Sequence, residues 1–125
     1  MPNSKREVVL VEDDIGMRRA VTRMLSTAGY EVRVFDSAEA LLDELAGDAL
    51  WAACSCMVCD VRLPGVSGFE LHRRLSERGR LPPWIFITAF DNQPVREQAN
   101  QAMATCLTKP FEGRTLLALI ARLLG

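Results

Sequence analysis

The sequence predicts a doubly wound α/β domain, in which helices cover both faces of a parallel sheet. Three observations predict this fold class: short apolar runs typical of buried strands, longer stretches with apolar residues at helical spacing, and a regular alternation of the two along the chain. Parallel neighbours need a crossover connection, which a helix supplies. Because the chain has 125 residues, 49% of them hydrophobic and 25% charged, we expect one domain spanning residues 1–125.

The first two strand–helix units show how each element is identified. Residues 8–11 form a β-branched apolar run, and the next helix carries an apolar stripe that Gly29 ends. A second strand at residues 31–35 is followed by Asp36 and Ser37 as a helix start, and Gly47 closes that helix. The first stripe consists of Met17, Ala20, Val21, Met24, Leu25 and Ala28, and the second of Ala38, Leu41, Leu42 and Leu45.

The other three units follow the same order. A third strand at about residues 56–60 leads through a turn at 63–65 to a helix that begins after Ser67, reaches about Arg78 and stops at Gly79. The fourth and fifth strands are expected at residues 84–88 and 105–108, and the Lys109–Pro110 bond is a candidate cis peptide. The inward positions of the last two helices are Val95, Ala99, Ala102 and Met103, then Leu116, Leu119, Ile120 and Leu123.

Charge and hydropathy exclude several function classes. The sequence has fifteen Lys and Arg residues and sixteen Asp and Glu residues, which gives a net charge of -1. This leaves no global positive field, so we expect no direct nucleic-acid binding by this domain. The nearly apolar run at residues 49–59 is too short to cross a membrane, and the amino terminus lacks a signal-peptide core. We therefore expect a cytoplasmic protein with no membrane partner.

The cysteines and the single histidine do not predict a metal or nucleophile site. Cys54, Cys56 and Cys59 lack paired C-x-x-C spacing, and His72 lies in a different segment. We expect the cysteines to be reduced and to pack as small hydrophobic residues, and His72 to lie on a helix surface. Glycine-rich phosphate-binding motifs are missing as well, so nucleotide binding is not expected.

The chemistry is expected where the strands end, because ligands of doubly wound sheets bind at that edge. Carboxylates gathered there repel one another and favour a bound cation, and hard oxygen ligands suit Mg²⁺. Three carboxylates carry a charge that Mg²⁺ and one lysine together would neutralise. Such a balance is expected at a site where a carboxylate accepts a phosphoryl group. The residues at the strand ends are Glu12, Asp13, Asp14, Asp60, Thr88 and Lys109.

Four motifs over residues 7–124 resemble the receiver domains of two-component response regulators. The resemblance implies a flavodoxin-like (βα)5 fold whose parallel sheet has the order 2-1-3-4-5. Residues 60–71 are especially similar to receivers attached to helix-turn-helix transcription factors. The motifs are Val11-Glu12-Asp13-Asp14, the stretch 59–68, Ile87-Thr88-Ala89 and Thr108-Lys109-Pro110-Phe111.

The resemblance also implies a role for each site residue. Asp60 would accept a phosphoryl group from the phosphohistidine of a sensor histidine kinase. Asp13, Asp60 and the backbone carbonyl of Arg62 would bind Mg²⁺ directly, and Glu12 would act through water.

The remaining site residues would bind the phosphoryl group or hold the backbone. Lys109 would pair with Asp60 and then with a phosphoryl oxygen, and the Thr88 hydroxyl would move to another phosphoryl oxygen. Asp14 is better interpreted as a helix cap than as a ligand.

The implied function is a regulatory phosphoacceptor domain, not an enzyme, whose only chemistry is phosphotransfer and autodephosphorylation. The signal would pass to an output domain or a downstream protein, in transcription regulation, through the fourth helix, fifth strand and fifth helix or through the first and fifth helices. A homodimer formed on phosphorylation stays open. Arg18, Arg19 and Arg23 on the first helix are expected to form a solvated face, with kinase docking as the alternative.

Cys106 and the pair Ala102-Met103 depart from the family pattern, and two other residues bear on the phosphoryl lifetime. Cys106 stands where most receivers carry an aromatic residue, and Ala102-Met103 replaces a common Gly-Ala pair. We therefore predict activation through the loop after Thr88 and the fourth helix, without an aromatic gate. Arg62 and Phe90, each two positions past a site residue, are predicted to tune water access.

Two alternative functions remain at this stage. The first is an interaction module that keeps the fold but signals without phosphate. The departures at Cys106 and Ala102-Met103 favour this alternative, and the complete acid, lysine and threonine set opposes it. The second is a Mg²⁺-dependent phosphohydrolase with an aspartyl nucleophile. Such enzymes typically place a second acid two residues after the nucleophile, and here that residue is Arg62.

Overall fold

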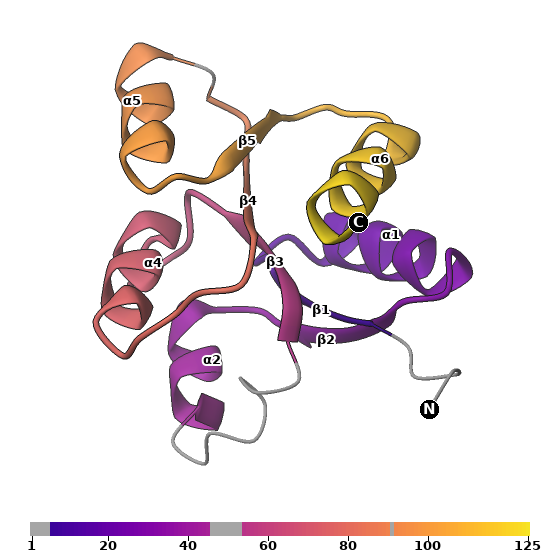
Figure 1. The fold of residues 1–125 in the computed structure, drawn as a ribbon, viewed down its shortest axis with the longest axis horizontal. Helices are drawn as coiled ribbons and strands as arrows, with labels where there is room; N and C mark the ends of the chain where they lie inside the picture. Colours follow the sequence, from indigo (N-terminus) through magenta and orange to yellow (C-terminus); the bar gives the residue numbers. More distant parts are fainter. Residues whose placement is uncertain (1–5, 46–53, 91) are drawn as a thin grey trace.

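The computed structural model describes residues 6–45, 54–90 and 92–125, and within them strands and helices alternate as predicted (Figure 1). The strands are β1 (Glu7–Val11), β2 (Glu31–Phe35), β3 (Cys54–Asp60), β4 (Trp84–Thr88) and β5 (Thr105–Thr108). The helices are α1 (Ile15–Thr27), α2 (Ala38–Glu44), α4 (Gly68–Ser76), α5 (Gln93–Gln101) and α6 (Gly113–Leu124).

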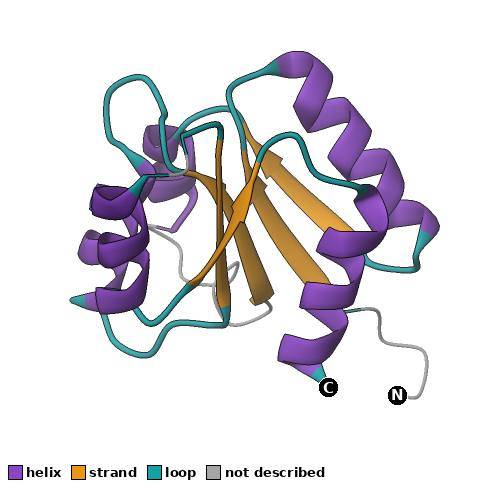
Figure 2. Cartoon of the chain, turned by 90° about the horizontal axis from the view of Figure 1, so that it is seen from above, coloured by secondary structure: helices purple, strands orange, loops and turns teal. Residues whose placement is uncertain are grey.

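All strand pairs in the sheet are parallel, and the strand order is β2-β1-β3-β4-β5. Helices α1 and α6 cover one face, while α2, α4 and α5 cover the other, so the sheet forms the middle of three layers (Figure 2). This arrangement confirms the predicted doubly wound fold and its strand order. β1 and β3 lie at the centre, and β2 and β5 form the two edges.

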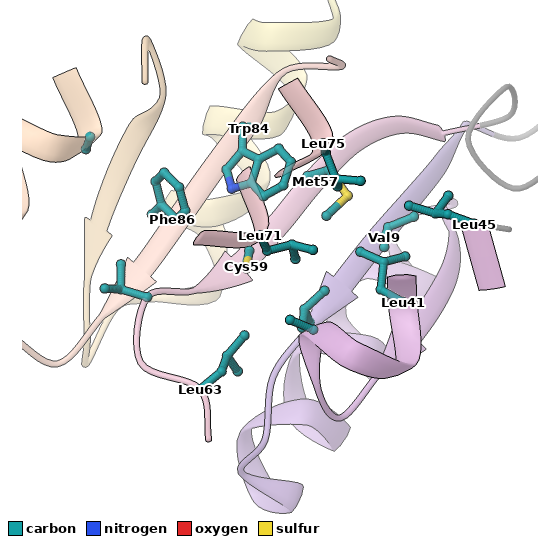
Figure 3. Packing of buried hydrophobic residues seen from close by; sticks show 14 residues of the cluster. Val9, Leu41, Leu45, Met57, Cys59, Leu63, Leu71, Leu75, Trp84 and Phe86 are labelled. Atoms are coloured by element: carbon teal, nitrogen blue, oxygen red, sulfur yellow. The ribbon is translucent and has the colours of Figure 1, made fainter. Parts of the chain in front are cut away.

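Each face of the sheet has its own apolar core. Val9 and Val11 of β1 pack on the side of α2, α4 and α5, together with Met57 and Phe86 (Figure 3). The alternate β1 residues Val8 and Leu10 pack against α1 and α6. Because side chains alternate across a strand, burial on both faces requires an almost continuous apolar run, which is what the sequence shows in β1 and β4.

The helix starts are set by side chains that cap free backbone N–H groups. Asp14 accepts a hydrogen bond from the Met17 N–H at 2.7 Å, and Ser37, Ser67 and Asn92 accept equivalent bonds at the starts of α2, α4 and α5. This confirms the predicted roles of Asp14, Ser37 and Ser67. The predicted stop at Gly47 lies outside the described residues. Predicted boundaries elsewhere differ from the observed ones by a few residues, as at the start of β3 and the end of α4.

The end of α5 differs from the prediction. Ala102 packs against the core as expected, but the helix ends at Gln101 and Met103 is 92% exposed with φ 56°. The reason is a closing turn in which the Ala104 N–H donates to the Ala99 carbonyl at 3.0 Å. This turn requires a left-handed residue after the helix, a position that glycine usually fills. The placement of Met103 on the inner face of the helix was therefore wrong.

The histidine and the cysteines contribute to packing. The His72 ring is half-buried and meets the Trp84 ring edge-on at 4.8 Å between centroids, so this side chain is less exposed than predicted. Cys56 and Cys59 are buried and Cys54 and Cys106 are half-buried, and none of these four cysteines is in a disulfide. Burial raises the pKa of the Cys56 thiol to about 12, which makes its thiolate form scarce.

The Lys109–Pro110 peptide bond is cis, as predicted. Arg6 donates to the Leu124 carbonyl at 2.7 Å and so ties the start of β1 to the end of α6. Among the described residues, helices are too short or too polar to cross a membrane.

Candidate functional site: an acidic pocket facing a lysine

The candidate site lies where the two central strands end. β2 pairs on one side of β1 and β3 on the other, so the strand order reverses here, and ligands of doubly wound sheets bind at such a point. Glu12 and Asp13 follow β1, and Asp60 is the last residue of β3. Their nearest carboxylate oxygens lie within 4.8 Å of one another. The predicted meeting of acids from two distant segments is therefore confirmed.

Lys109 connects two of these acids from the loop after β5. Its Nζ donates to Asp60 Oδ2 at 2.6 Å and to Glu12 Oε1 at 3.0 Å. Both carboxylates are almost fully buried, whereas the lysine side chain is 17% exposed. Burial alone would lower the pKa of Lys109, but its bonds to the two carboxylates outweigh that effect and raise it. The lysine therefore stays charged and neutralises part of the pocket.

The pocket still holds more negative charge than the lysine balances. Burial raises the pKa of Glu12 to about 7, and the nearby Asp60 charge adds to the effect. Hydrogen bonds from the Asp14 N–H and from Lys109 act in the opposite direction. Three carboxylates face one ammonium group, so a second cation would balance the remaining negative charge.

The donor set fits Mg²⁺. Three carboxylates provide hard oxygen ligands, and Asp13 is exposed, which leaves one side of the cluster open to water. Mg²⁺ typically takes one or two carboxylates and keeps several water ligands. Glu12, Asp13 and Asp60 are therefore the residues that could hold this ion.

Thr88 ends β4 beside the pocket and is buried. Its hydroxyl oxygen accepts a hydrogen bond from the Phe90 N–H at 2.9 Å and lies 3.3 Å from the Phe90 carbonyl, to which the hydroxyl donates. Its backbone carbonyl accepts a bond from the Lys109 N–H at 2.7 Å. Thr88 thus links the loop after β4 to the lysine.

The loop after β3 is held against Asp60 by its backbone. The Arg62 N–H donates to Asp60 Oδ1 at 2.9 Å, and the Gly68 N–H donates to the Val61 carbonyl at 2.9 Å. A Cβ atom at Gly68 would overlap the Asp60 carbonyl oxygen, so only glycine fits this close approach. The Arg62 guanidinium lies over the Phe90 ring.

Two further features concern residues whose local role the sequence did not predict. Arg18 was expected on a solvated face, yet its Nη1 donates to the Glu12 carbonyl at 3.0 Å and approaches the Asp13 carbonyl at 3.4 Å. The sequence could have indicated this contact, because Arg18 lies one helical turn after the Asp14 cap and can therefore reach back to the loop before the helix. Cys106 lies opposite Phe86 in the β4–β5 register, so the large aromatic ring is on β4, not on β5.

The fold and this pocket define a class of α/β domains in which buried acids face a lysine at the end of a parallel sheet. The chain belongs to the response regulator receiver domain family, whose profile matches residues 8–121.

Its relatives include the Nodulation protein W of Bradyrhizobium diazoefficiens, 39% identical over 92% of this chain and 49% of the relative. The transcriptional regulatory protein FixJ of the same organism is 35% identical over 94% of this chain and 56% of its own length. The chain therefore spans about half the length of these curated relatives. Among solved structures, the BeF3 activated DrrB receiver domain superimposes with a TM-score of 0.84 and 28% identity, covering 97% of this chain and 98% of that one.

Proposed function

We propose that the chain is a phosphorylation-controlled switch in which Asp60 accepts a phosphoryl group from a sensor histidine kinase. The observation that carries this proposal is the 2.6 Å bond between Lys109 Nζ and Asp60 Oδ2 in a pocket with a surplus of buried acid. Lys109 holds the acceptor oxygen of Asp60 in place. After phosphoryl transfer, the same ammonium group can bind a phosphoryl oxygen in place of the Asp60 oxygen.

In the proposed reaction, a carboxylate oxygen of Asp60 attacks the phosphorus of the phosphohistidine. The new O–P bond forms as the N–P bond breaks, and the released imidazole takes a proton from solvent. Lys109 exchanges its bond to Asp60 for one to a phosphoryl oxygen. Mg²⁺, held by Asp13, Asp60 and the Arg62 carbonyl, with Glu12 acting through water, would neutralise charge on the transferring group.

Thr88 is the proposed sensor of the phosphoryl group. Its hydroxyl is bonded to the Phe90 backbone, and a move toward a phosphoryl oxygen would break both of these bonds. The loop after β4 leads directly into α5, so release of Phe90 would reposition the start of that helix. Because Cys106 replaces the aromatic residue on β5, this route needs no aromatic gate.

The output is the regulation of transcription through an attached domain or a downstream protein. This proposal rests on relatives such as FixJ, named a transcriptional regulatory protein, and on their greater length. We propose α5, β5 and α6 as the face that transmits the change, with phosphotransfer and autodephosphorylation as the only chemistry of residues 1–125. The cytoplasmic location, the absence of nucleic-acid and membrane contacts by this domain and a homodimer formed on phosphorylation stay predictions.

Intact-protein mass spectrometry with acetyl phosphate tests the function directly. Incubation with Mg²⁺ should add about 80 Da, the mass of one phosphoryl group that replaces a proton. The adduct should be lost in Asp60→Asn and without Mg²⁺. A chain that gains no mass would support an interaction module that works without phosphate, and continuous phosphate release would support a phosphohydrolase.

A second measurement tests the route through Thr88. On addition of beryllofluoride and Mg²⁺, backbone NMR signals of Phe90 and α5 should shift in the wild type. Thr88→Val should still bind beryllofluoride but leave the α5 signals in place. Unchanged α5 signals in the wild type would contradict the route.

A further inference from the structure

An exposed acid on a neighbouring helix contacts the loop that follows Asp60. Glu39 lies in the first turn of α2, and its Oε2 accepts a hydrogen bond from the Val66 N–H at 2.9 Å. Gly65 has φ +76°, and a Cβ atom there would overlap the Glu39 carboxylate. The loop backbone thus closes directly onto this side chain. The Val66 bond also lowers the pKa of Glu39, so the carboxylate is ionised at neutral pH.

The same loop is fixed at its base and supports the site between its two attachments. Gly68 donates to the Val61 carbonyl at 2.9 Å, and the Arg62 N–H donates to Asp60 at 2.9 Å. Arg62 therefore lies in a loop that is closed at one end by the Gly68–Val61 bond and held at Val66 by Glu39. A change at the outer end would alter the path of the whole loop.

We propose that Glu39 is a positioning residue, which holds the loop at residues 62–67 so that the Arg62 carbonyl faces the acidic pocket. This inference rests on the proposed function, because the carbonyl is a metal ligand only if the pocket binds Mg²⁺. Glu39 is not one of the acids that cluster at the candidate ion site, and its carboxylate meets the loop at Gly65 and Val66. The bond requires an acceptor oxygen at the end of the side chain at position 39, which a carboxylate or a carboxamide can supply.

Three variants separate this role from two simpler ones. Glu39→Ala removes both the acceptor and the charge, whereas Glu39→Gln removes the charge but keeps an acceptor oxygen. Ser37→Ala removes the cap of the same helix, which accepts from the Ala40 N–H at 3.1 Å, and leaves the loop contact intact. Ser37→Ala is therefore the control for loss of helix stability, and Glu39→Gln the control for loss of charge.

Two readouts are needed, one of which does not depend on the metal. Amide hydrogen exchange in EDTA should show faster exchange at Val66 in Glu39→Ala, with rates in β1 and β3 unchanged. Calorimetric titration with MgCl2 should show about tenfold weaker binding in Glu39→Ala, the low end of the effect of residues that support metal ligands. Glu39→Gln should stay close to the wild type in both, and Ser37→Ala should bind Mg²⁺ normally despite lower stability.

The outcomes distinguish failure of the inference from failure of the function. Unchanged exchange at Val66 in Glu39→Ala, or unchanged Mg²⁺ affinity beside a normal wild type, would overturn the positioning role. Equal weakening in Glu39→Gln and Glu39→Ala would overturn it too, since charge alone would then explain the effect. A wild-type chain that does not bind Mg²⁺ would contradict the proposed function, whereas the exchange rates would still report whether Glu39 holds the loop.

Discussion

The guanidinium carbon of Arg62 lies 3.9 Å from the centroid of the Phe90 ring. Arg62 follows Asp60 by two positions and Phe90 follows Thr88 by two positions, so the pair joins the loops after β3 and β4. Phe90 is 44% exposed, so the contact lies at the surface. A cation above an aromatic face is attracted by the negative potential of the ring. This contact limits how far the two loops can separate.

Disrupting this contact should shorten the lifetime of phosphorylated Asp60. Arg62→Ala or Phe90→Ala should speed dephosphorylation about 2- to 5-fold, which corresponds to a cation–π energy of about 0.5–1 kcal/mol. The physical reason is that the loops then separate and admit water. Decay of the phosphorylated mass over time measures the rate. Arg114→Ala, at an exposed position on α6, is the matched control, and equal decay in all four proteins would contradict the prediction.

Replacing the buried lysine should destabilise the fold as well as remove the reaction. Lys109→Met leaves Glu12 and Asp60 facing each other without a cation, so the free energy of unfolding should fall by about 3 kcal/mol at neutral pH. Mg²⁺ should restore part of this loss. Urea unfolding with and without Mg²⁺ measures it, and Arg74→Met, which removes an exposed ion pair with Glu70, should have little effect. A Lys109→Met protein as stable as the wild type would contradict the prediction.

In the metal-free protein, the contribution of Glu12 to the free energy of unfolding should fall as the pH rises toward neutrality. The pKa of Glu12 rises from 4.5 to about 7 on folding, so the folded state binds a proton more tightly than the unfolded state. Between pH 4.5 and about pH 7, the Glu12 contribution to the free energy of unfolding therefore falls with increasing pH. Above about pH 7 this contribution is constant.

Urea unfolding in EDTA between these pH values measures the effect, with Glu12→Gln as the reference. The difference between the two proteins is the informative quantity, because burial lowers the pKa of His72 and changes stability in the opposite direction. His72 contributes equally to both proteins and cancels. A pH-independent difference would show that Glu12 does not carry the predicted shift.

The turn after α5 offers a stabilising substitution. Met103 has φ 56°, a conformation that costs a side chain with a Cβ atom roughly 1 kcal/mol or more and glycine almost nothing. Met103→Gly should therefore raise the free energy of unfolding by about 1 kcal/mol. Met103→Ala should leave it nearly unchanged, because Met103 is almost fully exposed and alanine keeps the strain. Chemical denaturation of the three proteins checks both statements.

Most of the fold and the acidic pocket could be predicted because they depend on local patterns and one rule of topology. The spacing of apolar residues specifies each strand and helix, and the carboxyl ends of parallel strands meet at one edge. Glu12 and Asp60, far apart in the chain, therefore had to converge once both were placed at strand ends. Lys109 followed by the same reasoning.

Contacts between loops could not be predicted in this way. The Glu39–Val66 bond joins residues 27 positions apart, and the Arg62–Phe90 contact depends on how two irregular segments bend. The exposure of Met103 depends on a backbone bond that closes the helix, which its apolar character does not reveal. Each case involves a conformation without periodicity, so the spacing of residues carries no information about it.

The two charges of the site are carried by unequal parts of the sheet. Glu12 and Asp60 border central strands whose side chains are almost all buried, whereas Lys109 follows β5, an edge strand of four residues that are only partly covered. The two buried carboxylates thus belong to the interior of the sheet, whereas the lysine amine comes from the loop after its edge strand. A phosphoryl group that attracts the Lys109 amine would therefore act first at the edge of the sheet, and the buried central strands would contribute least to the change.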